Sequence, residues 1–145
     1  MAFTSVIALS PALAIKPSQT QPLDMHGSGY GFYRTSEGYW EGTVWAHYDE
    51  NGAPDNRQGV WEVGIEGIDW EEDPPSSLWY TMGFVDFEHF SGPILIAKGT
   101  FGPDAPEWPL SDLSFTYIAN LKTMKWILTG PGFMFRGDIE VINGY

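Results

Sequence analysis

Two segments in the last third of the chain decide the fold: GPILIAKGTF at residues 92–101 and LTGPGFMFRGDIEVI at residues 128–142. Both are rich in aromatic and β-branched residues, which favour strands, and the first alternates with a period of two. The sequence Gly130-Pro131-Gly132 within the second segment is typical of a turn. This end of the chain therefore predicts short antiparallel strands joined by tight turns.

The residues upstream follow the same pattern, with short strand-like runs separated by Gly, Pro and Asp. No stretch keeps the apolar spacing of a helix, so we expect an all-β domain with eight to ten strands. Closure into an eight-stranded barrel would leave no unpaired edge strand at which so aromatic a sheet could associate with other chains. The expected strands cover residues 4–9, 29–34, 39–49, 60–70, 78–90, 94–101, 113–119, 123–128 and 133–142, with loops at 16–28, 50–56, 71–77 and 102–110.

Alternation divides two of these strands into faces. Residues 39–49 place Val44, Ala46 and Tyr48 on one face and Trp45 and His47 on the other. Residues 60–70 separate the apolar positions 61, 63 and 65 from the glutamates at 62 and 66, and either set could point into a barrel. Residues 78–90 are apolar on both faces, which predicts a strand covered on both sides.

Composition limits the classes of function. The chain of 145 residues fits one domain, and 7 Trp, 7 Tyr and 9 Phe support the all-β interpretation. A formal net charge of −12 argues against nucleic acid and anionic lipid as partners, and no apolar run is long enough for membrane insertion. Residues 3–15 are apolar but lack a preceding Lys or Arg, which favours a strand and a cytoplasmic protein over a leader and secretion.

Three motifs resemble the β-barrel shared by allene oxide cyclases and dirigent proteins. They are the Gly-x-Ile-x-Ile-x-x-Gly-Thr-Phe-like strand at 92–101, the Thr-Gly-x-Gly-like turn at 129–132, and the aromatic-Arg-Gly strand that follows at 133–138. Pro131 departs from the second glycine of the family's turn. The resemblance covers about 50 residues of the last third, and the proline-and-glutamate catalytic region of the plant cyclases has no counterpart.

The resemblance implies a closed antiparallel barrel with an apolar pocket in its interior. It also implies a cyclase or isomerase that folds a small natural-product intermediate, polyketide- or terpenoid-like, without a metal or organic cofactor. A non-catalytic binding protein of the lipocalin or dirigent kind is the alternative. A barrel filled by its own side chains, with a structural role, is the third hypothesis.

Candidate catalytic residues are those whose side chains could hold a substrate oxygen or move a proton: His47, Glu66, His89, Tyr117 and Arg136. Arg136 could instead pair with Asp138. Candidate substrate-binding residues are Trp45, Tyr80, Met82, Phe84, Phe115, Trp126, Phe133 and Phe135. These aromatic side chains could equally form the core or an interface between copies of the chain, so a homo-oligomer stays open.

No metal site is expected, because the three histidines show no paired spacing along the sequence. His26 lies in a Gly-rich segment, where we expect it to be exposed to solvent in a loop.

Overall fold

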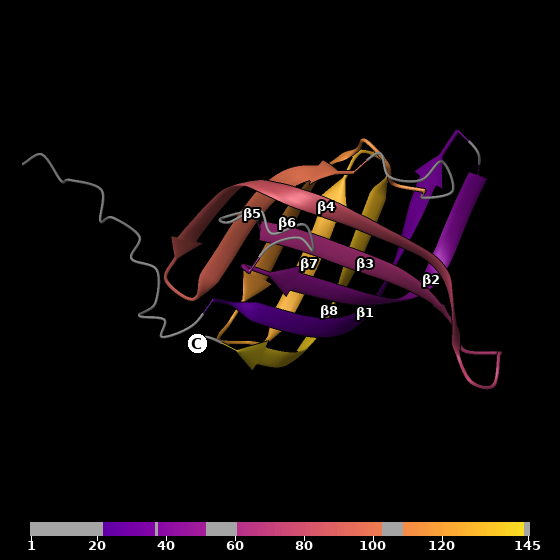
Figure 1. The fold of residues 1–145 in the computed structure, drawn as a ribbon, viewed down its shortest axis with the longest axis horizontal. Coiled ribbons are helices and arrows are strands. Elements are labelled where there is room, and N and C mark those ends of the chain that lie inside the picture. The colour runs from indigo at the N-terminus through magenta and orange to yellow at the C-terminus, as the bar shows by residue number, and fades with distance from the viewer. Residues whose placement is uncertain (1–21, 37, 52–60, 103–108, 144–145) are drawn as a thin grey trace, which may run out of the picture.

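The computed structural model describes residues 22–36, 38–51, 61–102 and 109–143, and these form eight strands and no helix (Figure 1). Each strand pairs antiparallel with the next, and β1 pairs with β8, so the sheet closes into a barrel. The predicted closed eight-stranded antiparallel barrel is confirmed. The strands are β1 (Asp24–Thr35), β2 (Gly38–Asp49), β3 (Trp61–Asp69), β4 (Ser76–Ser91), β5 (Ile94–Phe101), β6 (Ser114–Asn120), β7 (Lys125–Gly130) and β8 (Phe133–Asn143).

The part of the chain that the structure describes contains no helix with the length and apolarity of a membrane span.

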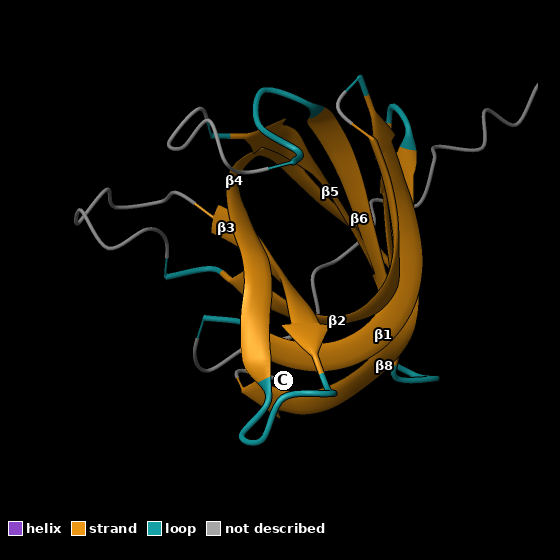
Figure 2. Ribbon diagram, turned by 90° about the vertical axis from the view of Figure 1, so that its right-hand side faces the viewer, coloured by secondary structure: helices purple, strands orange, loops and turns teal. Residues whose placement is uncertain are grey.

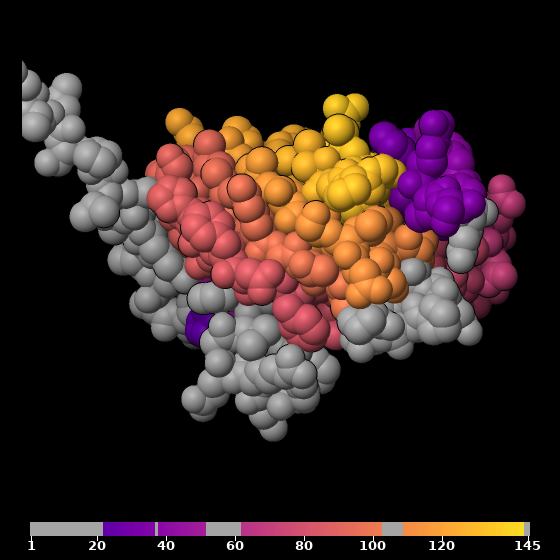
Figure 3. Space-filling view, turned by 90° about the horizontal axis from the view of Figure 1, so that it is seen from above, coloured from indigo at the N-terminus to yellow at the C-terminus, as the bar shows by residue number. Residues whose placement is uncertain are grey.

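The strands curve around a common interior (Figure 2), and the last strands lie beside the first ones on the surface (Figure 3).

Two expectations about the strands need correction. The segment at residues 16–28 was expected to be a loop, but β1 begins at Asp24, where Met25 is buried inside the barrel and the backbone pairs with β2 and β8. The strand at 78–90 was expected to be covered on both sides, but Leu78 and Phe87 are half exposed on its outer face. The strand expected at residues 4–9 lies outside the described residues.

Aromatic side chains pack against one another in the interior. The ring of Tyr117 stacks between those of Tyr48 and Trp126, with centroid distances of 5.2 and 6.3 Å. At another place in the barrel, Trp40 and Trp79 meet edge to face at 5.1 Å. Burial of such rings is the largest favourable contribution to the stability of the barrel, at roughly 2–3 kcal/mol for each large side chain.

The ladder between β1 and β8, called the seam below, has glycine on both strands. Gly29 pairs with Gly137, and a Cβ atom added at Gly137 would lie 1.8 Å from the carbonyl oxygen of Ser28. One added at Gly29 would lie 2.6 Å from the indole of Trp126. The two backbones and the indole therefore approach so closely because neither position carries a side chain.

The turn that carries the family-like motif also ends at the seam. Gly132 has a φ of +77°, which only glycine adopts readily, and its carbonyl oxygen accepts a 2.7 Å hydrogen bond from the Arg34 amide. The turn thereby connects the start of β8 to the end of β1.

Substitution of Gly137 by alanine tests the seam. We expect Gly137→Ala to lower the free energy of unfolding by about 3 kcal/mol or more, because the new methyl group meets backbone that cannot move aside. Gly64→Ala is the matched control, since the atoms nearest to its methyl group would belong to the end of the Tyr80 side chain, with the hydroxyl at 2.8 Å, and not to backbone. Urea unfolding measures both variants, and equal losses would contradict this account of the seam.

Candidate functional site

The outer wall of the barrel carries an open hollow of about 950 Å³ across β8, β1, β2 and β3. We call it the outer hollow. Its apolar lining exceeds its polar lining, as is usual for small-molecule sites. Its side chains come from the outward positions of these strands and from the residue after β3: Ser28, Tyr30, Thr43, Trp45, Glu66, Ile68, Trp70, Arg136, Asp138 and Glu140.

Strand register brings these residues together. Ser28 pairs with Asp138 on one side and with Trp45 on the other, and Trp45 pairs with Glu66. The next outward position of β1, Tyr30, pairs with Arg136 and with Thr43. Side chains two apart on a strand share a face, so the hollow consists of two adjacent rows across four strands.

Hydrogen bonds hold two of the aromatic side chains that line the outer hollow, Trp70 and Tyr30. The indole N–H of Trp70 donates to the Thr43 hydroxyl at 2.5 Å. The Tyr30 hydroxyl donates to Glu41 at 2.8 Å, and the Tyr39 hydroxyl donates to the other oxygen of the same carboxylate. The hydrogen bonds from Tyr39 and Tyr30 lower the pKa of Glu41, and the pKa of Tyr30 is raised in return. Glu41 therefore points outward and holds the hydroxyls of Tyr30 and Tyr39.

Arg136 brings positive charge to an acidic protein. Among the described residues it forms no hydrogen bond and no ion pair, because Asp138 pairs with Lys125 instead. The alternative in which Asp138 neutralises Arg136 is therefore wrong. Arg136 lines both the outer hollow and a second hollow of about 550 Å³ over β6 to β8, while Glu66 lies on the far side of the outer hollow, on β3.

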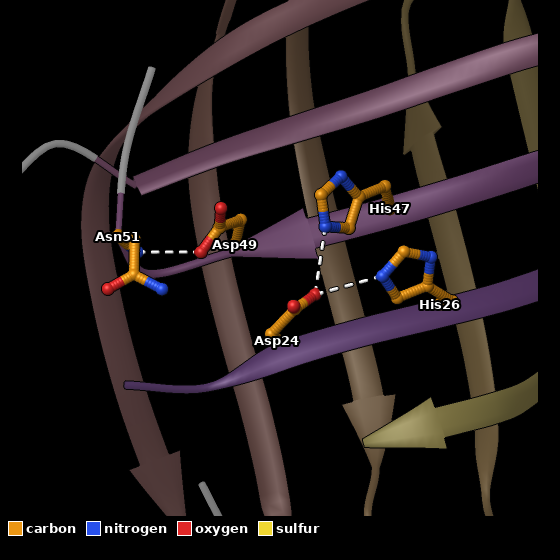
Figure 4. A network of polar contacts seen from close by, with 5 residues as sticks. All are labelled: Asp24, His26, His47, Asp49 and Asn51. Atoms are coloured by element: carbon orange, nitrogen blue, oxygen red, sulfur yellow. Dashed lines mark hydrogen bonds and ion pairs between the residues drawn. The ribbon is translucent and has the colours of Figure 1, made fainter. Parts of the chain in front are cut away.

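A cluster of three polar side chains borders the outer hollow: Asp24 and His26 on β1 and His47 on β2 (Figure 4). Nε2 of His47 lies 2.9 Å from Oδ1 of Asp24, and Nε2 of His26 lies 3.1 Å from the same oxygen. The His26 ring is 6.3 Å from the ring of Trp45, which lines the hollow. We call this group the Asp-His-His cluster.

Polar groups also occur inside the barrel. A β-bulge between Val85 and Phe87 shifts the alternation of β4, and the Tyr48 hydroxyl donates a hydrogen bond to the carboxylate of Glu88. Burial, followed by the charge of Glu88, raises the pKa of Tyr48. Burial alone raises the pKa of Tyr117, so both tyrosines stay protonated at neutral pH.

The five expected catalytic residues do not form one site. Glu66 and Arg136 line the outer hollow, and His47 belongs to the neighbouring Asp-His-His cluster. His89 is exposed near the end of β4, where its ring stacks on Phe87, and Tyr117 is buried in the interior.

The expected substrate-binding residues divide into an inner and an outer set. Phe115, Trp126, Phe133 and Phe135 are buried inside the barrel. Trp45 lines the outer hollow, and the outward positions of β4 hold Tyr80, Met82 and Phe84 beside β3. The hollows described above all lie on the outer wall, and a pocket in the interior stays a prediction.

Four functional residues of the outer wall were not among the candidates: His26, Asp24, Tyr30 and Trp70. The first two have a signal that the sequence contains. A hairpin formed by the expected strands at 29–34 and 39–49 turns between residues 36 and 37, so the numbers of paired residues add up to 73. This sum places His26 opposite His47, as the structure shows. Asp24 follows from the period of two. Trp70 has no such signal, because its position depends on the end of β3.

Comparison with family models, with curated proteins and with solved structures finds no match for the chain. The resemblance to the allene oxide cyclase and dirigent barrels therefore stays a hypothesis.

The buried Tyr117 hydroxyl leads to a prediction about alkaline pH. An unfolded tyrosine ionises near pH 10, whereas Tyr117 in the barrel keeps its proton, so stability falls by about 1.4 kcal/mol per pH unit above that point. We therefore expect Tyr117→Phe to lose less stability than the wild type between about pH 8 and about pH 11. Urea unfolding at about pH 8 and about pH 11 measures this difference, and an equal loss of stability in both proteins would contradict the burial of the hydroxyl.

Proposed function

We propose that the protein binds a small, flat, largely apolar molecule in the outer hollow. One observation carries the proposal: Tyr30, Trp45 and Trp70 line the same hollow as Arg136, which has no partner among the described residues. Aromatic faces bind apolar rings, and a guanidinium binds an oxygen of a carboxylate or carbonyl group.

The dimensions agree with a ligand of this kind. The volume of about 950 Å³ lies within the range of small-molecule sites. The hollow crosses four strands, and three strand spacings amount to roughly 14 Å. A molecule of two or three fused or linked rings has about this length.

The charges restrict the ligand further. A net charge of −12 repels anions in general, so a ligand with several negative groups would be disfavoured. Arg136 compensates for one such group at one end of the hollow, while the aromatic side chains require an apolar body. The ligand class is therefore an apolar ring system with one anionic or carbonyl oxygen.

A cyclase or isomerase is the second candidate, and the placement of Glu66 and Arg136 in one hollow favours it. Arg136 would polarise a substrate oxygen, while the Glu66 carboxylate would accept a proton from one carbon of the molecule and return it to another. The surface of the hollow would hold a flexible chain in a reactive shape.

A test of this second candidate compares the wild type with Glu66→Gln. The wild type would convert a linear terpenoid- or polyketide-like chain into a product of unchanged mass, and Glu66→Gln would not. Equal conversion by both proteins would contradict a role for Glu66.

Binding of 1-anilinonaphthalene-8-sulfonate, an aromatic anion, tests the main proposal. We expect Arg136→Gln to weaken binding by about tenfold, because a hydrogen bond to a charged group contributes roughly 1.5–3 kcal/mol and tenfold corresponds to about 1.4 kcal/mol. Trp70→Ala should weaken binding of this probe and also of the uncharged N-phenyl-1-naphthylamine. Fluorescence titration of the wild type and both variants with each probe measures these affinities.

Phe87→Ala is the matched control for Trp70→Ala, because Phe87 is also an exposed aromatic residue but lies away from the hollow. It should leave both affinities unchanged. Unchanged binding in Arg136→Gln and Trp70→Ala, with native circular dichroism, would place the ligand elsewhere and overturn the proposal.

A further inference from the structure

The Asp-His-His cluster has the composition of a metal site. It supplies two imidazole nitrogens and one carboxylate oxygen, and these three atoms all lie within 4.8 Å of one another. All three residues are partly buried on the outer face of the β1–β2 hairpin. Figure 4 shows the rings of His26 and His47 directed toward the same carboxylate oxygen of Asp24.

The separations between the ligand atoms agree with coordination. Two atoms that each lie about 2.1 Å from one ion, at angles between 90° and 109°, are about 3.0–3.4 Å apart. Oδ1 of Asp24 lies 2.9 and 3.1 Å from the two Nε2 atoms. The two separations from Asp24 are therefore close to those of atoms that coordinate one ion.

The backbone fixes two of the ligands relative to each other. His26 and His47 are paired residues of an antiparallel ladder, and their rings lie 4.4 Å apart. Asp24 is two residues before His26 and therefore points to the same side of the sheet. The free energy needed to assemble the site is small, because the fold has already ordered the strands that carry it.

We propose that Asp24, His26 and His47 bind a divalent transition-metal ion of borderline softness, such as Zn²⁺, Co²⁺ or Ni²⁺. Imidazole nitrogen suits these ions, whereas Mg²⁺ and Ca²⁺ prefer sites made entirely of oxygen ligands. The net charge of −12 also favours a cation. This inference does not depend on the proposed function.

The site is open. Asp49 pairs with Asp24 across the hairpin, but its carboxylate accepts a 2.7 Å hydrogen bond from the backbone N–H of Asn51, and the described residues supply three protein ligands to the cluster. Three ligands leave at least one coordination position for water or another molecule. Because the ring of His26 lies beside Trp45, that position borders the outer hollow.

Metal titration of the tag-free, full-length protein tests the inference. Isothermal titration with Zn²⁺ and visible absorption with Co²⁺ should both show one equivalent bound. His26→Gln, His47→Gln and Asp24→Asn should each weaken the affinity by tenfold or more, since loss of groups that merely orient ligands already costs about 10–100-fold. Excess Mg²⁺ should not displace Co²⁺.

His89→Gln is the matched control, because it removes an exposed histidine of β4 that lies outside the cluster. It should bind Zn²⁺ and Co²⁺ like the wild type, and circular dichroism should confirm that every variant is folded. The inference is overturned if the wild type binds neither ion, if the three cluster variants bind as the wild type does, or if His89→Gln loses binding equally.

Discussion

The close approach of β1 and β8 is the constraint on which the rest of the barrel depends. Gly29 and Gly137 face each other in this ladder, and a Cβ atom on either would collide with the backbone of the neighbouring strand. Their lack of side chains allows the sheet to close and gives the indole of Trp126 room over β1. Closure then pairs every strand, so the ladder leaves no free edge.

The same seam determines where binding groups can be. Inside the barrel, Trp126 continues into a stack with Tyr117 and Tyr48, and the rings of this stack occupy the interior. Outside, the residues that alternate with the glycines of β1 carry functional groups, namely His26, Ser28 and Tyr30. Closure places them beside β8 and its Arg136, so that residues more than a hundred positions apart share one hollow.

Alternation alone predicted much of this arrangement. The sequence places Val44, Ala46 and Tyr48 on one face of a strand, and the structure buries all three inside. It could not show which outward side chains of β8 meet those of β1, because that depends on closure of the barrel. Arg136 reaches Tyr30 only because β8 pairs with β1. The start of β1 was missed because glycine-rich segments lack the apolar alternation that indicates a strand.

We propose that the ligand binds to the outer wall and not among the aromatic side chains of the interior. The indole N–H signals in a ¹H–¹⁵N correlation spectrum test it most directly, because tryptophans occupy both places. On titration with 1-anilinonaphthalene-8-sulfonate, the account predicts shifts for Trp45 and Trp70, which line the outer hollow, and none for the interior Trp126. A shift of Trp126 with Trp45 and Trp70 unchanged would contradict it and place the ligand inside the barrel.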